Sequence, residues 1–281
     1  MSRFLLLGSK GMLGRAFCEK LASAGHTHRE LDLPELDISE RSQVEACVEP
    51  SYAAVINCAA YTNVDRAESE EPTALRVNAV GPGNLAEVCR ERGVTLVHFS
   101  TDYVFSGSAS VPYPVDEPLA PLNAYGRTKA EGEIAIRKAG VRHLILRTSW
   151  LYAPWASNFV RTMVKLSRER DSLKVVDDQR GRPTSAEQLA QTTLDLLGLG
   201  AQGTLHATDG GECTWFEFAR EIVRLAGARC AISPCSTAEF PRPAKRPVYS
   251  VLDIAPTEKA LGKPLRDWHQ ELADVMRRLE P

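Results

Sequence analysis

The chain has 281 residues, of which 43% are apolar and 25% are charged, a composition typical of a globular protein with one large domain or two unequal ones. Lys and Arg total 34 against 36 for Asp and Glu, and a net charge of −2 gives no positive field for binding nucleic acid. No stretch approaches the ~18 consecutive apolar residues of a membrane helix, and no secretion signal is visible, so we expect a cytoplasmic protein that binds neither nucleic acid nor membrane.

The first predicted unit is a strand, a glycine loop and a helix. The apolar run Phe4–Leu7 is followed at once by Gly8, Gly11 and Gly14, and a helical pattern then runs to Gly25. This order is typical of the first strand and helix of a parallel sheet.

The same alternation continues along the chain. Apolar runs predict strands at 53–57, 94–100 and 143–147, and periodic patterns predict helices at 74–92 and 124–139. Asn123 is the expected N-cap of the second of these helices, and Gly140 is expected to end it. Residues 1–150 are therefore predicted to form a doubly wound, Rossmann-type α/β parallel sheet.

Beyond Trp150 the pattern weakens into loops that contain proline and three helical stretches, at 158–170, 186–197 and 214–226. We predict an NAD(P)-binding domain over 1–150 and mainly a smaller substrate-binding lobe over 151–281. Part of 184–215 is expected to return to the main sheet.

The seven cysteines are scattered, without a C-x-x-C pair or a histidine at a ligand spacing. We interpret them as reduced thiols and predict neither disulfides nor a metal site. They are Cys18, Cys47, Cys58, Cys89, Cys213, Cys230 and Cys235.

The glycine loop suits a dinucleotide diphosphate, because backbone can approach the phosphates and a helix N-terminus offers N–H groups. Its spacing is G-x-x-G-x-x-G, which differs from the G-x-G-x-x-G fingerprint. Asp32 ends the second strand, where an acid binds the adenosine ribose. Asp32 would repel a 2′-phosphate whereas Lys10 would pair with one, so NADH and NADPH both stay open.

Tyr125 and Lys129 lie four residues apart and so share one face of the predicted helix. The lysine is expected to lower the pKa of Tyr125 and to ease proton transfer near neutral pH. Thr101, at the end of the preceding strand, would hold the same substrate oxygen through its hydroxyl. Together they predict a proton-transfer site.

Segments in order along the chain resemble the extended short-chain dehydrogenase/reductases, and among them the dTDP-4-dehydrorhamnose reductase family. The matching segments are 8–14, 35–39, 57–68, 78–79, 99–107, 123–129, 147–152, 178–184, 246–247 and 250–253.

The resemblance implies a Rossmann-type domain with a smaller C-terminal substrate lobe, and reduction of the 4-keto group of dTDP-4-dehydro-L-rhamnose with NADPH or NADH. This reaction belongs to the nucleotide-sugar biosynthesis that supplies O-antigen or cell-wall polysaccharide. Tyr125 would donate the proton while the nicotinamide delivers hydride, Lys129 would hold the nicotinamide ribose, and Thr101 would orient the carbonyl. A homodimer and a Mg²⁺ ion are allowed by the resemblance alone, and no residues are predicted for them.

The resemblance also implies contacts with the two ligands. The expected cofactor-binding residues are Gly8, Lys10, Gly11, Met12, Leu13, Gly14, Asp32, Asp37, Ile38, Ala60, Tyr61, Thr62, Asn78, Phe99, Tyr125 and Lys129. The expected substrate-binding residues are Val64, Thr101, Asp102, Tyr125, Trp150 and Arg246. Arg242, Lys245 and Arg246 either bring cations to the substrate diphosphate or form a solvated basic loop.

Other hypotheses stay open. A reductase or an epimerase of another nucleotide sugar would need the same Tyr125 and Lys129, and a non-catalytic NADP-binding regulatory subunit would share the fold. The intact set of Thr101, Tyr125 and Lys129 argues against a protein that only binds. A sugar-nucleotide dehydratase is disfavoured because Tyr103 stands where those enzymes carry a glutamate base.

Overall fold

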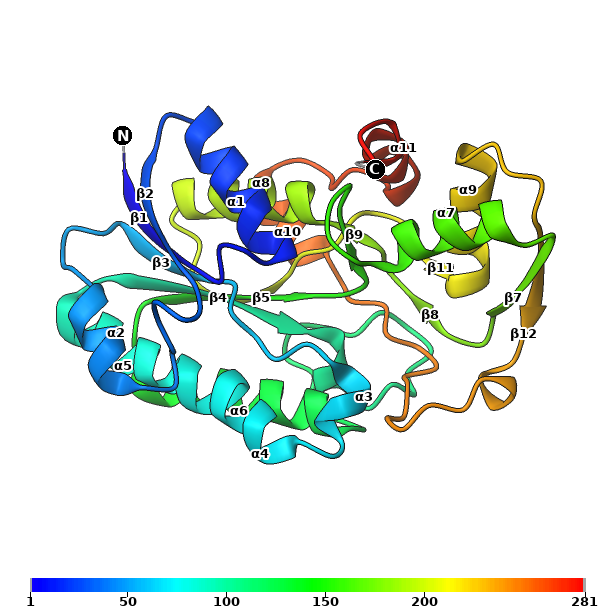
Figure 1. Ribbon diagram of the computed structural model, residues 1–281. Helices are drawn as coiled ribbons and strands as arrows, with labels where there is room; N and C mark the ends of the chain where they lie inside the picture. The colour runs from blue at the N-terminus through cyan, green and yellow to red at the C-terminus, as the bar shows by residue number, and fades with distance from the viewer. Residues whose placement is uncertain (1, 280–281) are drawn as a thin grey trace.

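The computed structural model describes residues 2–279, which are built around one parallel sheet (Figure 1). Six strands pair in the order β10-β5-β4-β3-β1-β2. Their bounds are β1 Arg3–Leu7, β2 Thr27–Leu31, β3 Ala54–Asn57, β4 Thr95–Thr101, β5 His143–Thr148 and β10 Gly203–His206. Because the strands are parallel, their carboxyl ends lie at one edge of the sheet. The predicted doubly wound α/β fold is confirmed.

Helices cover both faces of the sheet (Figure 1). One face carries α1 (Met12–Ser23) and α8 (Ala186–Gly198), and the other carries α2 (Arg41–Cys47), α5 (Gly81–Arg92) and α6 (Ala124–Ala139). Leu6 packs into the first of these cores, whereas Leu5 and Leu7 pack into the second. The run of apolar residues in β1 thus reflects a strand that is buried on both faces.

The bounds of helix α6 are set by the two residues that cap it. The Asn123 side chain accepts the backbone N–H of Gly126 at 2.8 Å, and Gly140 ends the helix in the left-handed conformation, at φ 69°. A Cβ on Gly126 would lie 2.1 Å from the carbonyl oxygen of Tyr103. This glycine therefore lets the first turn of α6, with Tyr125, approach the residues that follow β4.

The helix predicted over 74–92 is longer and less regular than expected. Helix α4 (Glu71–Leu75), a π-helical turn (Arg76–Val80) and α5 follow one another without a break. Pro82 has no N–H to donate to the carbonyl of Asn78 one turn back, which weakens the α-helical pattern at this junction. Helix α3 (Val64–Ala67) is a single turn that precedes α4.

The chain returns to the main sheet after Trp150, because β10 pairs with β5 and α8 packs against α1. Much of the rest forms a smaller lobe around a separate apolar core that includes Phe218 and Leu272 (Figure 1). Its main elements are α7 (Phe159–Glu169), β7 (Ser172–Val176), α9 (Trp215–Leu225), β12 (Ala231–Cys235) and α11 (Trp268–Arg277). Short elements complete the chain: β6 Leu151–Tyr152, β8 Arg180–Gly181, β9 Thr184–Ser185, β11 Cys213–Thr214 and α10 Ala255–Leu261.

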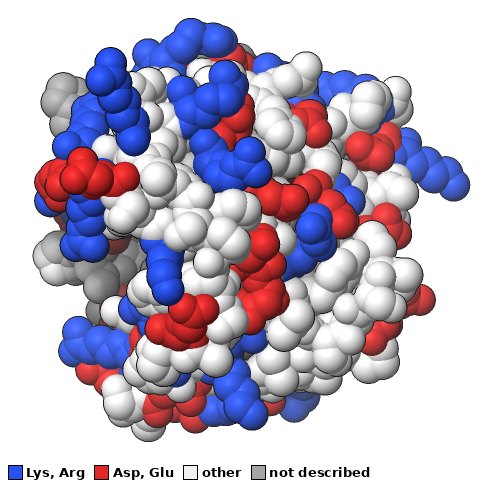
Figure 2. Space-filling view, turned by 90° about the vertical axis from the view of Figure 1, so that its right-hand side faces the viewer, with Lys and Arg blue, Asp and Glu red and all other residues white. Residues whose placement is uncertain are grey.

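The charged side chains on the outer face of the small lobe are of both signs. Figure 2 shows Lys and Arg interspersed with Asp and Glu there, in keeping with the net charge of −2. Within residues 2–279, no helix combines the length and the apolar character that a membrane crossing requires.

Candidate active site

The glycine loop makes a tight turn at the end of β1. Gly8 has φ 72°, and a Cβ there would lie 2.6 Å from the backbone nitrogen of Ala59. A Cβ on Gly14 would lie 2.1 Å from the carbonyl oxygen of Gly8. Only glycine fits these two positions. Helix α1 begins at Met12, so its free N–H groups and its positive end face the loop and form a cradle for a phosphate.

A cavity of about 340 Å³ opens beside this loop, at the carboxyl ends of β1, β2 and β3. The predicted cofactor residues that line it are Gly8, Lys10, Gly11, Asp32, Asp37, Ile38 and Ala60. Asp32 fixes the loop, because its carboxylate accepts the backbone N–H of Lys10 at 2.9 Å. The Lys10 amine pairs with Glu35 at 3.2 Å. The structure thus brings together seven of the residues expected to bind the cofactor around one cavity.

Other predicted cofactor residues lie outside the lining of this cavity. Asn78 is buried, and its amide is used within the protein: Oδ1 accepts the N–H of Tyr61 at 2.9 Å and Nδ2 donates to its carbonyl at 3.0 Å. Asn78 therefore shapes the segment that holds Tyr61 and the exposed Thr62. The carbonyl of Met12 accepts the indole N–H of Trp155 at 3.1 Å. Leu13 and Phe99 belong to the core beneath α1.

A cluster of hydroxyl and carboxylate groups follows β4. The Thr101 hydroxyl donates to the Asp102 carboxylate at 2.8 Å, and Thr101 also hydrogen-bonds to Tyr125. The ring of Tyr103 meets that of Tyr125 edge-on, with 5.7 Å between centroids. Burial raises the pKa of Asp102 to about 6, so its carboxylate carries the negative charge of this cluster at neutral pH.

Tyr125 is a phenol rather than a phenolate at neutral pH. Burial raises the pKa of Tyr125 to about 12, and the Asp102 carboxylate adds to the rise while the hydrogen bond with Thr101 opposes it. The expected lowering of this pKa by Lys129 is absent. The Lys129 amine instead donates to the carbonyl of Phe99 at 2.6 Å. A protonated tyrosine of this kind is suited to donating a proton.

A second cavity, of about 720 Å³, lies between the small lobe and the end of β4. Tyr103 forms part of the wall of this cavity, and its ring also contacts that of Tyr125. The cavity therefore lies next to the cluster around Tyr125. One part of the wall is apolar and aromatic, with Phe159, Met163, Leu166, Trp215 and Phe240. The cations of the wall are Lys174, Arg242, Lys245 and Arg246. A flat apolar surface beside several cations suits a nucleotide with a diphosphate.

The predicted substrate residues are placed differently from one another. Arg246 lines the second cavity and pairs with Asp65 at 3.0 Å, and Val64 is the first residue of the same helical turn as Asp65. Trp150 does not line this cavity. It stacks on Trp215, with 3.6 Å between ring centroids, and so supports an aromatic residue that does. Trp150 has φ 48°, a strained backbone conformation for a non-glycine residue.

Sequence reasoning missed Trp215 and Phe159 as cavity residues. Both stand in the first turn of a helix that was predicted, α9 or α7. Their aromatic side chains read as part of the apolar stripe that faces the core. The three aromatic residues at the start of α9 were a signal that could have found Trp215, whereas the single aromatic residue of α7 gave none for Phe159.

One group of three possible metal ligands occurs within residues 2–279: Cys18 of α1 with His28 and Glu30 of β2. A thiol and an imidazole suit softer metals, whereas Mg²⁺ takes oxygen ligands. This group does not fit the Mg²⁺ ion that the resemblance allowed.

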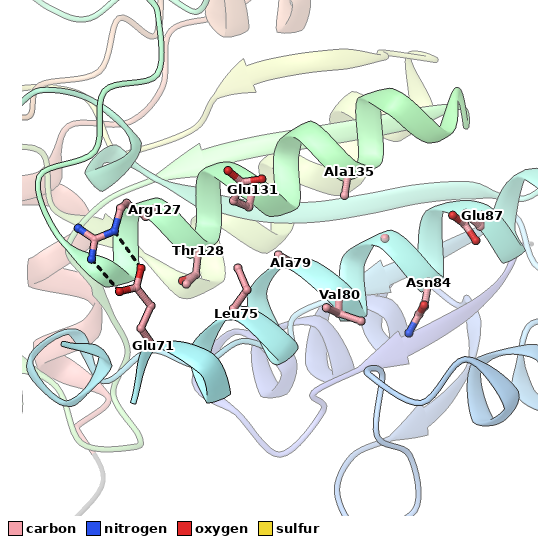
Figure 3. Close-up of a pocket in the computed structure, with 11 residues that line it drawn as sticks. Glu71, Leu75, Ala79, Val80, Asn84, Glu87, Arg127, Thr128, Glu131 and Ala135 are labelled. Carbon is pink, nitrogen blue, oxygen red and sulfur yellow. Dashed lines mark hydrogen bonds and ion pairs between the residues drawn. The ribbon is translucent and has the colours of Figure 1, made fainter. Parts of the chain in front are cut away.

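A third hollow, of about 620 Å³, lies on the outer side of α6, between it and the run from α4 to α5 (Figure 3). Arg127 points across it to Glu71 and pairs with that carboxylate at 2.9 Å. None of the predicted site residues lines it. The candidate active site is therefore the region of the first two cavities and the cluster around Tyr125.

Comparison with known proteins gives consistent matches over the chain. Residues 2–280 match the family model described as the RmlD substrate binding domain. A probable dTDP-4,6-dihydroxy-2-methyloxan-3-one 4-ketoreductase of Streptomyces antibioticus is 43% identical, over 97% of this chain and 94% of that protein. A dTDP-4-dehydrorhamnose reductase of Mycolicibacterium smegmatis is 40% identical, over 98% of this chain and 85% of that protein.

A solved structure of dTDP-4-dehydrorhamnose reductase from Bacillus anthracis, in complex with NADP, is 36% identical and has a TM-score of 0.94. The alignment covers 98% of this chain and 99% of that one. The two lobes and their order along the chain are therefore shared with a protein that holds a dinucleotide.

Proposed function

The chain belongs to the family of the RmlD substrate binding domain, and we propose that it reduces the 4-keto group of a dTDP-4-dehydro-6-deoxysugar with NADPH or NADH. It is an NAD(P)H-dependent oxidoreductase of nucleotide-sugar biosynthesis. The substrate that we favour is dTDP-4-dehydro-L-rhamnose, with dTDP-L-rhamnose as the product, for O-antigen or cell-wall polysaccharide. The observation that carries the proposal is the protonated Tyr125 beside Thr101, next to a large cavity with aromatic and cationic walls.

The proposed chemistry is a proton transfer matched to a hydride transfer. When bound, the reduced nicotinamide supplies the hydride to C4 of the sugar. Thr101 would turn its hydroxyl proton from Asp102 to the carbonyl oxygen and orient it, and Tyr125 would give its phenolic proton to the same oxygen. The carbonyl becomes an alcohol, and the phenolate that is left takes a proton from solvent. Lys129 would bind the nicotinamide ribose from the same face of α6.

The residues present fit the cofactor. Gly8 and Gly14 leave room that a Cβ would fill, and the N-terminus of α1 supplies N–H groups for the diphosphate. Asp32 and Lys10 stand where the adenosine ribose would lie, so one acid and one cation would contact its 2′ position. We propose that residues 1–150, with α8 and β10, hold the cofactor and that the smaller lobe holds the nucleotide sugar.

The second cavity supports the choice of a nucleotide diphosphate sugar. Arg246 and the neighbouring Arg242 and Lys245 would neutralise the two phosphates. Trp215, supported by Trp150, would offer its ring to the base or the sugar. A location in the cytoplasm and assembly as a homodimer stay predictions, which cell fractionation and light scattering of the purified protein test.

The direct test mixes the purified protein with NADPH or NADH and a panel of 4-keto nucleotide sugars. Absorbance of the reduced cofactor at about 340 nm is followed in each mixture. The panel includes dTDP-4-dehydro-L-rhamnose, its epimers and the ketosugar named for the Streptomyces relative. We expect the fastest loss of absorbance with dTDP-4-dehydro-L-rhamnose. No loss with any pair would overturn the proposed reduction, and a faster reaction with another ketosugar would reassign the substrate.

A further inference from the structure

A line of hydrogen bonds runs through the interior from the residues after β3 to Lys129. Asn57 ends β3; its Oδ1 accepts the backbone N–H of Ala59 at 3.1 Å, and its Nδ2 lies 3.1 Å from Nδ1 of His98. Nε2 of His98 lies 3.2 Å from Nζ of Lys129, which donates to the carbonyl of Phe99 at 2.6 Å. The side chains of Asn57, His98 and Lys129 are buried, at 1%, 0% and 2% exposure. A mismatch between donors and acceptors here is therefore costly.

The backbone N–H of Ala59 sets the direction of the whole line. Because this N–H can only donate, it requires the oxygen of the Asn57 amide, which leaves the NH₂ group of Asn57 facing His98. Nδ1 of His98 must then accept, so a neutral ring carries its proton on Nε2. The Nε2–H group of His98 faces Nζ of Lys129. Nζ can accept this hydrogen bond only as a neutral amine, because an ammonium has no lone pair.

A charged Lys129 would break this order. An ammonium has three donors and no acceptor, so His98 would have to present a bare Nε2 and carry its proton on Nδ1, facing the NH₂ group of Asn57. Two donors would then oppose each other in a dry interior, at a cost of about 1–3 kcal/mol. The hydrogen bonds therefore favour the neutral amine.

We propose that, in alkaline solution, Asn57 and His98 are positioning residues that hold Lys129 as a neutral amine until the cofactor binds, and that Lys129 takes up a proton on binding. The ribose hydroxyls of a bound dinucleotide accept hydrogen bonds and its diphosphate is anionic, and both favour the ammonium form. The cation that stabilises a phenolate at Tyr125 then arises only in the complex. Tyr125 keeps its proton in the free enzyme and becomes more acidic once the hydride donor is in place. This inference rests on the proposed reductase function.

The surroundings of Lys129 set the pH range of this assignment. Burial lowers the pKa of Lys129 to about 8, with Glu133 and Cys58 opposing the shift, so the amine of the free enzyme is neutral above about pH 8. Glu133 is already paired with Arg147 at 2.8 Å. Burial raises the pKa of the Cys58 thiol, so this group is neutral, and burial together with Lys129 lowers the pKa of His98 well below its usual range. Among the described residues, the ionisable groups that act on Lys129 are His98 from β4, Cys58 after β3, and Glu133 from its own helix.

The first experiment reads the ring of His98 directly, without any need for activity. Nitrogen-15 NMR of the free protein at about pH 9 distinguishes the two neutral tautomers and the imidazolium. We expect the Nε2–H tautomer in the wild type. In Asn57→Asp, a carboxylate that only accepts faces Nδ1, and we expect the ring to change to Nδ1–H. An Nδ1–H tautomer or an imidazolium in the wild type would overturn the proposal.

The second experiment counts protons by titration calorimetry of the free enzyme with NADPH, at about pH 9 and in two buffers of different ionisation enthalpy. We expect the wild type to take up close to one proton per NADPH. Asn57→Asp should take up much less, because its Lys129 is already charged. His98→Gln should behave likewise, since an amide oxygen accepts from an ammonium, and it serves if Asn57→Asp fails to fold.

Gln270→Glu adds the same charge on an exposed position of α11 and should match the wild type. Equal proton uptake in wild type, Asn57→Asp and His98→Gln would refute the role of the line. These results can be separated from a failure of the proposed function. If the protein binds NADPH with these proton changes but reduces no ketosugar, the inference about Lys129 stands and only the proposed reaction is wrong.

Discussion

The Thr101 hydroxyl donates to the Asp102 carboxylate at 2.8 Å, and both residues act on the acidity of Tyr125, in opposite directions. The hydrogen bond with Thr101 lowers the pKa of Tyr125, and the charge of Asp102 raises it. The pKa of Tyr125 therefore depends on the balance between these two opposing effects.

Replacement of Asp102 by Asn is predicted to move the alkaline limb of the rate profile. The substitution removes the negative charge that raises the pKa of Tyr125, so the phenol ionises at a lower pH. We expect the alkaline limb of kcat to shift down by about one pH unit. The measurement is the initial rate against pH, and Asp116→Asn, at an exposed carboxylate, should show no shift. An unchanged or raised limb in Asp102→Asn would contradict the balance.

Tyr125→Phe is predicted to separate binding from chemistry. The variant keeps the ring and loses only the proton donor, so kcat should fall by about 10²–10⁴. Cofactor affinity, measured from NADPH fluorescence, should stay within about twofold of the wild type. Tyr249→Phe removes a phenol outside the catalytic cluster and should keep its turnover. Full activity of Tyr125→Phe would remove this residue from the mechanism.

The burial of Lys129 is predicted to reduce the stability of the fold at neutral pH. Its folded pKa of about 8 lies below the usual value of 10.5, so the unfolded chain binds more protons between these two values. The penalty is complete below about pH 8, where it approaches 3 kcal/mol, and it disappears as pH rises through about 10.5.

Lys129→Met should therefore unfold at higher urea concentration than the wild type near pH 7, by up to about 3 kcal/mol less the lost hydrogen bonds. The gain should shrink as pH rises, while activity is lost. The measurement is urea unfolding at several pH values, with the exposed Lys165→Met as the control. A gain in stability that does not vary with pH would show that packing, and not charge, is responsible.

Gly14→Ala is predicted to weaken cofactor binding. The new Cβ would meet the carbonyl oxygen of Gly8 at 2.1 Å, so the glycine loop or the start of α1 must move. We expect the Kd for NADPH to rise by at least about tenfold, with about 1–3 kcal/mol lost in stability. Gly83→Ala is the matched control, because its Cβ would lie an ordinary 3.5 Å from the Cβ of Ala135. A Gly14→Ala variant with unchanged affinity would exclude the loop from the cofactor site.

Arg246→Gln is predicted to weaken binding of the nucleotide sugar without changing binding of the cofactor. The guanidinium lines the second cavity, and its loss removes one cation from the proposed diphosphate site. We expect KM for the sugar nucleotide to rise about tenfold while the KM for NADPH stays unchanged. Arg224→Gln, on the exposed surface of α9, controls for the loss of charge. Equal changes in both KM values would point to a general loss of structure.

Local chemistry explains which parts of the structure were predictable. The bounds of α6 follow from an Asn that caps and a Gly that takes a positive φ, and both act within one turn. The pairing of Tyr125 with Lys129 follows from the helical repeat alone. The glycine loop could be predicted because the close approach of backbone atoms at Gly8 and Gly14 excludes any side chain, and this leaves glycines at fixed spacing in the sequence.

The remaining features depend on contacts between distant segments. The meeting of Lys129 with His98 requires the position of α6 against β4, which no local pattern contains. Trp215 was missed because an apolar helix face reads the same whether it packs on a core or lines a cavity. The two-residue strands of the small lobe are too short for an alternating pattern to appear.

The pairing of β10 with β5 restricts how such a protein can be divided or recombined. A fragment that stops at residue 150 would lack α8, and the side chains of Leu144 and Leu146 would lose their cover and face water. Such a half would aggregate rather than bind a dinucleotide. Replacement of the smaller lobe by that of a relative would therefore require exchange of two separate segments, one between β5 and α8 and one after β10. A single junction at residue 150 would divide the core that α8 shares with β5.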